Sequence, residues 1–129
     1  MGVKMSKNHR FNFAVAYADT DAEGVMYHAR YIEIAERARS NWSREMVIPD
    51  GDIGFGAREL DIKYMQPLLL NDEFVVETEI VKLGAASMTI EQKFVKKDKI
   101  CAIMHITIAY LGANMRPKAI PESILKMFD

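Results

Sequence analysis

An acidic segment near the N terminus contains the residues whose types and spacing could do chemistry. Asp19, Asp21 and Glu23 lie within five residues, and Gly24 and a predicted helix beginning at about His28 follow them. A carboxylate beside a helix N terminus places a base or nucleophile next to backbone N–H groups that the helix leaves unpaired. Such N–H groups can polarise a carbonyl and stabilise the oxyanion that forms on attack. The segment could therefore serve acyl transfer.

A thioester is the acyl compound that suits such a site. Its thiolate is a good leaving group, so a single carboxylate can act without a Ser–His pair or a strong general acid. The sequence contains no G-x-S-x-G, Walker loop, C-x-x-C or H-E-x-x-H motif that would indicate another active site. One interpretation of the segment is therefore thioester hydrolysis by one of its carboxylates, with no cofactor.

Two other interpretations of the acidic segment have to be weighed against the catalytic one. An acidic turn that is merely solvated and favoured by the dipole of the following helix would have the same composition. The run Asp19-x-Asp21-x-Glu23-Gly24 is also similar to the start of a calcium-binding loop. That loop requires a bidentate glutamate at its twelfth position, where this sequence has Arg30. No metal site is therefore expected.

The elements that must position this segment can be predicted from hydrophobic periodicity. Alternation from Phe11 to Tyr17 predicts a strand, and apolar residues at steps of three and four predict a helix over residues 28–46. Further strands are expected at 55–64, 73–83, 86–97 and 100–111, with a short helix at 121–128. A strand, a long helix and four consecutive strands indicate an α+β fold with one five-stranded antiparallel sheet.

Composition limits the class of protein. The 129 residues, with a net charge of −1, fit a single domain spanning 1–129, with residues 1–10 as a flexible tail. We expect no nucleic-acid binding, because there is no excess of positive charge. No run approaches the roughly 18 apolar residues of a membrane span, and no signal-peptide core is evident. These features and the single cysteine predict a cytoplasmic protein.

Three other residues could be mistaken for catalytic groups. Cys101 opens an apolar strand and is interpreted as a small buried hydrophobe. His105 lies in the middle of the same strand and is expected to be a packed or interface histidine. His9 falls within the expected tail.

One helix can cover only part of a five-stranded sheet, and edge strands need protection, so we also expect self-association.

The acidic segment resembles a known family. The pattern Tyr17-x3-Asp21-x2-Gly24-x2-Tyr27-His28-x2-Tyr31 closely resembles the signature of the 4-hydroxybenzoyl-CoA thioesterase family, and most of all its bacterial branch associated with the Tol-Pal envelope system. Supporting similarities follow along the chain: Glu36-Arg37-Ala38-Arg39, Tyr64-x2-Pro67, Asp72-Glu73, and Met115-Arg116-Pro117-Lys118-Ala119-Ile120-Pro121 with Ile124. The resemblance covers residues 11–127.

The resemblance implies a hot-dog fold, in which a long central helix is wrapped by a five-stranded antiparallel sheet. It implies homodimers that often form homotetramers, with the active site at the dimer interface. By the same resemblance, Asp21 is the catalytic carboxylate and the backbone N–H of His28 polarises the thioester carbonyl. Tyr17 and the His28 side chain line the site, and Gly24 and Tyr27 belong to its substrate-binding part.

The turn expected between the third and fourth strands departs from the family pattern. Benzoyl-specific members carry basic residues there, at the CoA phosphates, whereas this sequence reads Gly84-Ala85-Ala86. Lys82 and Ser87 are the polar residues nearest this turn and are expected to meet the CoA part. Short- or medium-chain acyl-CoA, aromatic acyl-CoA and acyl carrier protein thioesters all remain open as substrates.

Two rival functions follow from the same resemblance. A hot-dog dehydratase or hydratase would need a catalytic histidine with a carboxylate reached across the fold, and the pattern from Tyr17 to Tyr31 fits that arrangement poorly. A non-catalytic acyl-thioester-binding protein could lose the carboxylate, whereas this chain keeps Asp21. We therefore predict an acyl-CoA thioesterase that releases a free acid and CoA.

Overall fold

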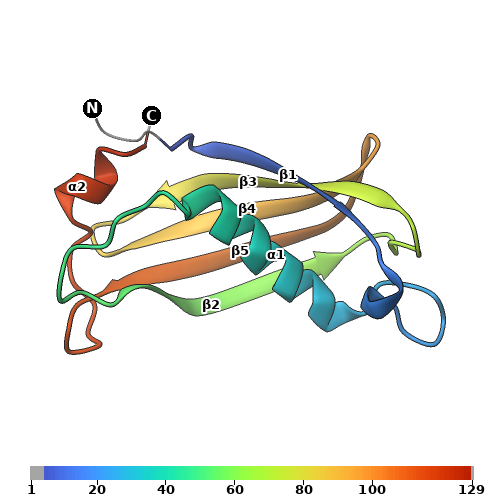
Figure 1. Cartoon of the computed structure of the whole chain (residues 1–129), viewed down its shortest axis with the longest axis horizontal. Coiled ribbons are helices and arrows are strands. Elements are labelled where there is room, and N and C mark those ends of the chain that lie inside the picture. The colour runs from blue at the N-terminus through green and yellow to red at the C-terminus, as the bar shows by residue number, and fades with distance from the viewer. Residues whose placement is uncertain (1–4, 129) are drawn as a thin grey trace.

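A five-stranded antiparallel sheet with one long helix across it forms most of the chain (Figure 1). The computed structural model describes residues 5–128. Its elements are β1 (Asn8–Ala14), the 3-10 turn η1 (Tyr17–Asp19), α1 (His28–Ser43), β2 (Gly54–Tyr64), β3 (Glu73–Leu83), β4 (Ser87–Lys96), β5 (Lys99–Leu111) and α2 (Glu122–Leu125). The strand order is β1-β3-β4-β5-β2. The predicted α+β fold is confirmed.

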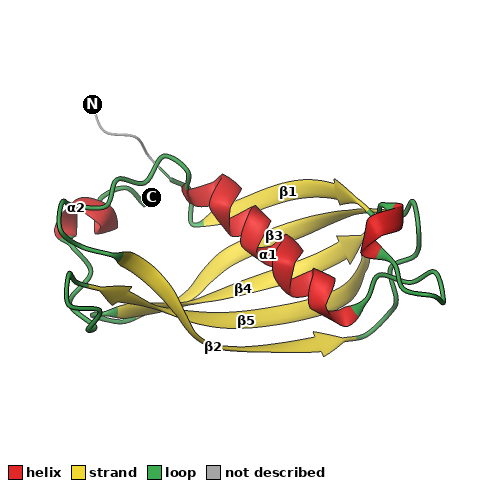
Figure 2. Ribbon diagram, turned by 60° about the horizontal axis from the view of Figure 1, so that its bottom comes forward, coloured by secondary structure: helices red, strands yellow, loops and turns green. Residues whose placement is uncertain are grey.

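The apolar face of α1 packs on one side of the sheet, as Figure 2 shows. Its buried residues are Tyr31, Ile34, Ala35, Ala38 and Trp42. Ala35 and Ala38 are fully buried, and their small side chains let the helix backbone approach the strands closely. On the sheet side, alternate residues of β4 are buried, including Ile90 and Phe94. Burial of each such large side chain stabilises the fold by about 1.5–3 kcal/mol.

A buried glutamine joins α1 to the sheet. Gln92 of β4 has no exposed surface, and its Nε2 donates to the carbonyl oxygen of Ala35 at 2.9 Å and to Oγ1 of Thr78 at 3.1 Å. Its Oε1 accepts a hydrogen bond from Nη1 of Arg39 at 2.9 Å. Because an unpaired buried amide is costly, these bonds favour one rotation of α1 over the sheet.

The prediction of a flexible tail over residues 1–10 is wrong for residues 5–10. β1 begins at Asn8, and Asn8 to Arg10 pair with Glu79 to Glu77 of β3. β1 is an edge strand, and its residues 8–10 are all polar. They show no alternation of apolar and polar residues, so the sequence predicts a strand only from Phe11. Residues 1–4 lie outside the part of the chain that the structure describes.

Other contacts fix this N-terminal segment to α1. His9 Nε2 lies 2.9 Å from Oδ1 of Asn41. The expectation that this histidine belongs to the flexible tail is therefore wrong. Trp42 Nε1 donates to the carbonyl oxygen of Ser6 at 2.6 Å. Other boundaries differ by a few residues: α1 ends at Ser43 rather than 46, and β1 ends at Ala14 before the 3-10 turn.

A polar cluster joins the loop after α1 to the C-terminal part of the chain. The hydroxyl of buried Tyr110 donates to Oδ2 of Asp52 at 2.7 Å, and Lys118 Nζ lies 3.0 Å from Oδ1. These two hydrogen bonds lower the pKa of Asp52 below its ordinary value. Burial and then the bond to Asp52 raise the pKa of Tyr110 to about 12. The carboxylate is therefore the form that the fold favours.

We predict that Asp52→Asn weakens the dependence of stability on acid pH. The lowered pKa means that the ionised carboxylate stabilises the fold above the ordinary aspartate pKa of about 3.9, and that this contribution disappears as the pH falls through the folded-state pKa. Melting temperatures measured from about pH 6 to pH 3 should fall less in this variant than in the wild type. Asp98→Asn, in the β4–β5 hairpin, is the matched control. An equal acid dependence in Asp52→Asn and the wild type would contradict the prediction.

Candidate active site

The loop that carries Asp21 is closed at its base and held by backbone hydrogen bonds. Thr20 and Met26 form an antiparallel bridge, and the N–H of Asp21 donates to the carbonyl oxygen of Val25 at 2.9 Å. The N–H of Gly24 donates to the carbonyl oxygen of Asp21 at 3.0 Å. Gly24 has a φ of +81°, a backbone conformation that glycine adopts without the penalty of a Cβ. The sequence therefore folds into a tight turn at this point.

The carboxylate of Asp21 is presented to solvent by this turn. Its Oδ1 accepts a hydrogen bond from the N–H of Glu23 at 2.9 Å, and the residue as a whole is exposed. An exposed carboxylate is accessible for attack on a carbonyl or for taking a proton from water. The predicted catalytic group is thus accessible in the single chain.

The N terminus of α1 follows directly. Tyr27 is its N-cap residue, and the N–H of Tyr27 donates to the carbonyl oxygen of Asp19 at 3.2 Å. Within residues 5–128, the backbone N–H groups of His28 and Ala29 donate to no other residue. These groups lie at the positive end of the helix dipole, where they can stabilise a developing oxyanion.

A small pocket of about 220 Å³ opens beside this helix end. It is lined by Val25, Met26, His28, Tyr31, Tyr64, Met65, Gln66 and Pro67. The Tyr64 hydroxyl donates to the carbonyl oxygen of His28 at 3.0 Å, and the rings of these two residues are 4.5 Å apart. The Tyr31 ring meets Tyr64 edge-on at 5.1 Å. Burial raises the pKa of both tyrosines, so their phenols stay neutral. The pocket combines an apolar wall with the free helix end.

The structure brings most of the predicted site residues together. Asp21, Gly24, Tyr27 and His28 lie in one continuous segment where the loop meets α1. Tyr17 begins η1 on the same loop, but its side chain is 84% exposed in the single chain. These five residues all belong to the segment 17–28.

Lys82 and Ser87 are not part of this group within one chain. Figure 1 shows the β3–β4 turn at one end of the sheet, whereas the start of α1 lies at the other. Ser87 pairs with Ala109 of β5, while Tyr64, beside His28, pairs with Ala102. Those seven residues along β5 correspond to about 23 Å. A second chain would be needed for either residue to reach the site.

Two residues at the site were not predicted as functional from the sequence. Tyr64 was noticed only within the motif Tyr64-x2-Pro67, and its contact with His28 depends on the pairing of β2 with β5. Arg30 was considered only as the residue that excluded a calcium loop. Its side chain in fact contacts Asp19 and the carbonyl oxygen of Ala18, which no sequence periodicity indicates.

Other reactive side chains lie away from the loop. Cys101 is 1% exposed and burial raises the pKa of its thiol, which confirms that it is a small buried hydrophobe. His105 lies on the sheet face opposite α1, between Glu91 at 3.0 Å and Asp61 at 3.7 Å. Among residues 5–128, no three histidine, cysteine or acidic side chains form a group that could hold a metal ion.

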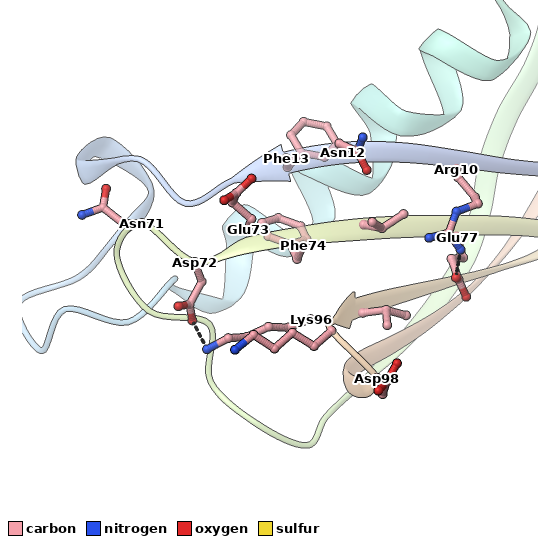
Figure 3. A pocket seen from close by; sticks show the side chains of 13 residues that line it. Arg10, Asn12, Phe13, Asn71, Asp72, Glu73, Phe74, Glu77, Lys96 and Asp98 are labelled. Atoms are coloured by element: carbon pink, nitrogen blue, oxygen red, sulfur yellow. Dashed lines mark hydrogen bonds and ion pairs between the residues drawn. The ribbon is translucent and has the colours of Figure 1, made fainter.

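A larger hollow than this pocket lies elsewhere on the described part of the chain. It measures about 910 Å³ and lies along β1, β3 and the β4–β5 hairpin, as Figure 3 shows. Arg10 is paired with Glu77, and Lys96 Nζ lies 3.0 Å from Oδ2 of Asp72. Asp21 and His28 do not line it. The larger hollow therefore contains none of the predicted site residues.

No helix between residues 5 and 128 is both long enough and apolar enough to cross a membrane.

Comparisons with known proteins agree with the fold and with the kind of site described above. Residues 15–128 match the family model described as the thioesterase-like superfamily. The acyl-CoA thioesterase YbgC of Haemophilus influenzae is 30% identical over 125 residues, which cover 92% of each chain. A probable thioesterase from Bartonella henselae superimposes with a TM-score of 0.78 and 28% identity, over 88% of this chain and 99% of that one.

A solved 4-hydroxybenzoyl-CoA thioesterase supports the fold assignment. It superimposes with a TM-score of 0.84 and covers 94% of this chain and 98% of that one, at 12% identity. At that identity the likeness shows the fold alone, and it confirms the predicted hot-dog arrangement. The family model and the relative from Haemophilus influenzae go further and establish descent: the chain belongs to the thioesterase-like superfamily.

Proposed function

We propose that this chain hydrolyses acyl-CoA thioesters to a free acid and CoA, with Asp21 as the catalytic carboxylate. The observation that carries the proposal is the exposed Asp21 side chain on a loop that leads directly into the free N terminus of α1. The named activity of the Haemophilus influenzae relative supports the same reaction.

The reaction needs two complementary groups. The thioester carbonyl oxygen accepts hydrogen bonds from the backbone N–H groups at His28 and Ala29, which strengthen as negative charge develops on that oxygen. In one route the Asp21 carboxylate attacks the carbonyl carbon and the CoA thiolate leaves, which forms a mixed anhydride that water then cleaves to release the acid and restore Asp21. In the other route Asp21 takes a proton from a water molecule that attacks the carbonyl carbon, and the CoA thiolate leaves from the resulting tetrahedral intermediate. In both routes the thiolate is a good leaving group. No metal ion or cofactor takes part in this scheme.

The remaining predicted residues have supporting roles. Gly24 lets the loop turn sharply enough to present Asp21 beside α1, and Tyr27 caps the helix. The His28 ring, packed on Tyr64, forms one side of the pocket for the acyl group. Tyr17, exposed on the same loop, lines the outer part of the site. The pocket volume of about 220 Å³ favours short or medium acyl chains or an aromatic ring.

A homodimer would complete this site. β2 is an edge strand, and its surroundings expose apolar side chains, including Leu60, Tyr64 and Met65. Antiparallel pairing of two β2 strands about a twofold axis would bring the β3–β4 turn of one chain to the end where α1 of the other begins. Lys82 and Ser87 would then reach the CoA part of a substrate bound by the second chain. We also propose that these dimers pair into homotetramers. Acyl carrier protein thioesters are a second candidate substrate class. The cytoplasm is the proposed compartment, because the free thiol of Cys101 fits a reducing environment.

Asp21→Asn should abolish most turnover while leaving the fold and substrate binding intact. Asparagine is nearly isosteric, but it can neither take the proton nor attack as an anion. We expect kcat for acyl-CoA hydrolysis to fall by about 10²–10⁴. The measurement is free thiol release from a panel of acyl-CoA substrates, read with a thiol-reactive dye. Turnover in this variant within about threefold of the wild type would exclude Asp21 as the catalytic carboxylate.

His28→Ala should be milder than Asp21→Ala, because the backbone N–H that contacts the oxyanion survives the change. We expect a loss in kcat of about tenfold to a hundredfold for His28→Ala, which removes ring packing on Tyr64. Circular dichroism of each variant provides the folding control. Equal losses in both variants would mean that the imidazole itself carries out the chemistry.

Sedimentation of the purified protein tests the shared site. The exposed β2 edge and its apolar surroundings predict at least a dimer at micromolar concentration. A stable monomer with a mass near the 14.7 kDa of one chain, and with full activity, would contradict the proposal that a second chain completes the site.

A further inference from the structure

We infer that Arg30 is a positioning residue that holds the Asp21 loop at the correct place relative to the N terminus of α1. This inference rests on the proposed function, because it concerns the geometry of that same site. Arg30 lies in the first turn of α1, nine residues after Asp21 along the chain. Its guanidinium nevertheless reaches back to the 3-10 turn that precedes Asp21.

Three contacts join Arg30 to this turn and to the helix cap. Its Nε lies 3.2 Å from Oδ1 of Asp19, and its Nη2 donates to the carbonyl oxygen of Ala18 at 3.0 Å. The guanidinium carbon also lies 5.2 Å from the centre of the Tyr27 ring, a cation–π distance. One planar side chain therefore contacts the loop before Asp21 and the cap after it. A lysine ammonium could not make all of these contacts at once.

Partial burial makes these contacts more than a surface ion pair. The side chains of Arg30 and Asp19 are only 26% and 19% exposed. The Nε atom itself is buried and has no well-directed hydrogen-bond acceptor, so its pairing with Asp19 depends on charge and proximity. A guanidinium in this setting loses part of its hydration, and its removal would leave the partly buried Asp19 carboxylate without this cationic partner.

Asp19 transmits this restraint to the catalytic loop. Its Oδ2 accepts a hydrogen bond from the N–H of Ala16 at 2.8 Å, and its carbonyl oxygen accepts one from the N–H of Tyr27 at 3.2 Å. Asp19 thus contacts the residue that precedes the 3-10 turn, the helix cap and Arg30 at the same time. Thr20 follows and forms the bridge with Met26 that closes the loop around Asp21. Moving Asp19 would therefore move the base of that loop.

The expected consequence is a loss of rate rather than of binding. Displacement of a reacting group by about 1 Å can reduce turnover a hundredfold, whereas substrate affinity depends on the whole acyl-CoA molecule. Arg30→Met keeps an unbranched apolar side chain at this position and removes every polar contact of the guanidinium. We expect it to lower kcat for acyl-CoA hydrolysis by about tenfold to a hundredfold, with KM within about twofold of the wild type.

Two variants separate this positioning role from a general effect of charge. Arg30→Lys restores the positive charge near Asp19 but not the planar contacts, and it should recover part of the lost kcat. Glu33→Gln removes only the partner that lies 3.0 Å from Nη1 one turn further along α1, and it should leave kcat unchanged. In an Asp21→Asn background, Arg30→Met should cause less than about a twofold further loss, because the group that it positions is already inactive.

Hydrogen exchange gives a readout that does not depend on turnover. Peptides covering residues 16–27 should exchange at least about tenfold faster in Arg30→Met than in the wild type, while residues 34–43 of α1 remain as protected. Equal exchange in residues 16–27 would overturn the inference, as would an unchanged kcat or a loss of kcat fully explained by unfolding. If the wild type released no thiol from any acyl-CoA, the proposed function would fail, and the exchange result would still decide whether Arg30 holds the loop.

Discussion

The packing of α1 on the sheet is the interaction on which the rest of the structure depends. A helix can present free N–H groups to a substrate only if its axis and its first turn are fixed, and here the apolar face of α1 and the Gln92 bonds to Ala35 and Arg39 fix them. Tyr31 and Tyr64 complete this support at the helix end itself. The loop that carries Asp21 leads directly into α1, so the position of this loop depends on where α1 begins.

The scaffold is buried and mostly apolar, whereas the candidate site is charged and exposed. The core around α1 is apolar apart from Thr78 and Gln92, whose hydrogen bonds satisfy one another and the helix. The acidic loop, in contrast, leaves Asp21 exposed to solvent. An enzyme that acts on thioesters can use such an exposed carboxylate, because the leaving group needs little help and the helix end supplies the electrostatic stabilisation.

Much of the fold could be predicted from the sequence because its elements are strongly periodic. The bounds of β3 and β5 and the start of α1 agree with the prediction to within a residue. β1 was placed less well, since an edge strand with one solvated face shows weak alternation between Asn8 and Arg10. For the site, the clustering of Asp21, Gly24, Tyr27 and His28 followed from their adjacency in the chain. The contacts of Tyr64 and Arg30, and the distance of Lys82 from the loop, depend on strand pairing and side-chain direction, which periodicity does not encode.

The central claim is that the thioester is held between Asp21 and the N terminus of α1. A crystal structure of the Asp21→Asn variant with a bound acyl-CoA tests this most directly, because the substrate should persist when the carboxylate is removed. We expect the thioester carbonyl oxygen to lie about 2.7–3.1 Å from the backbone nitrogen of His28 or Ala29, with the carbonyl carbon facing the side chain at position 21. An acyl-CoA bound with its thioester elsewhere, such as in the hollow along β1 and β3, would contradict the account.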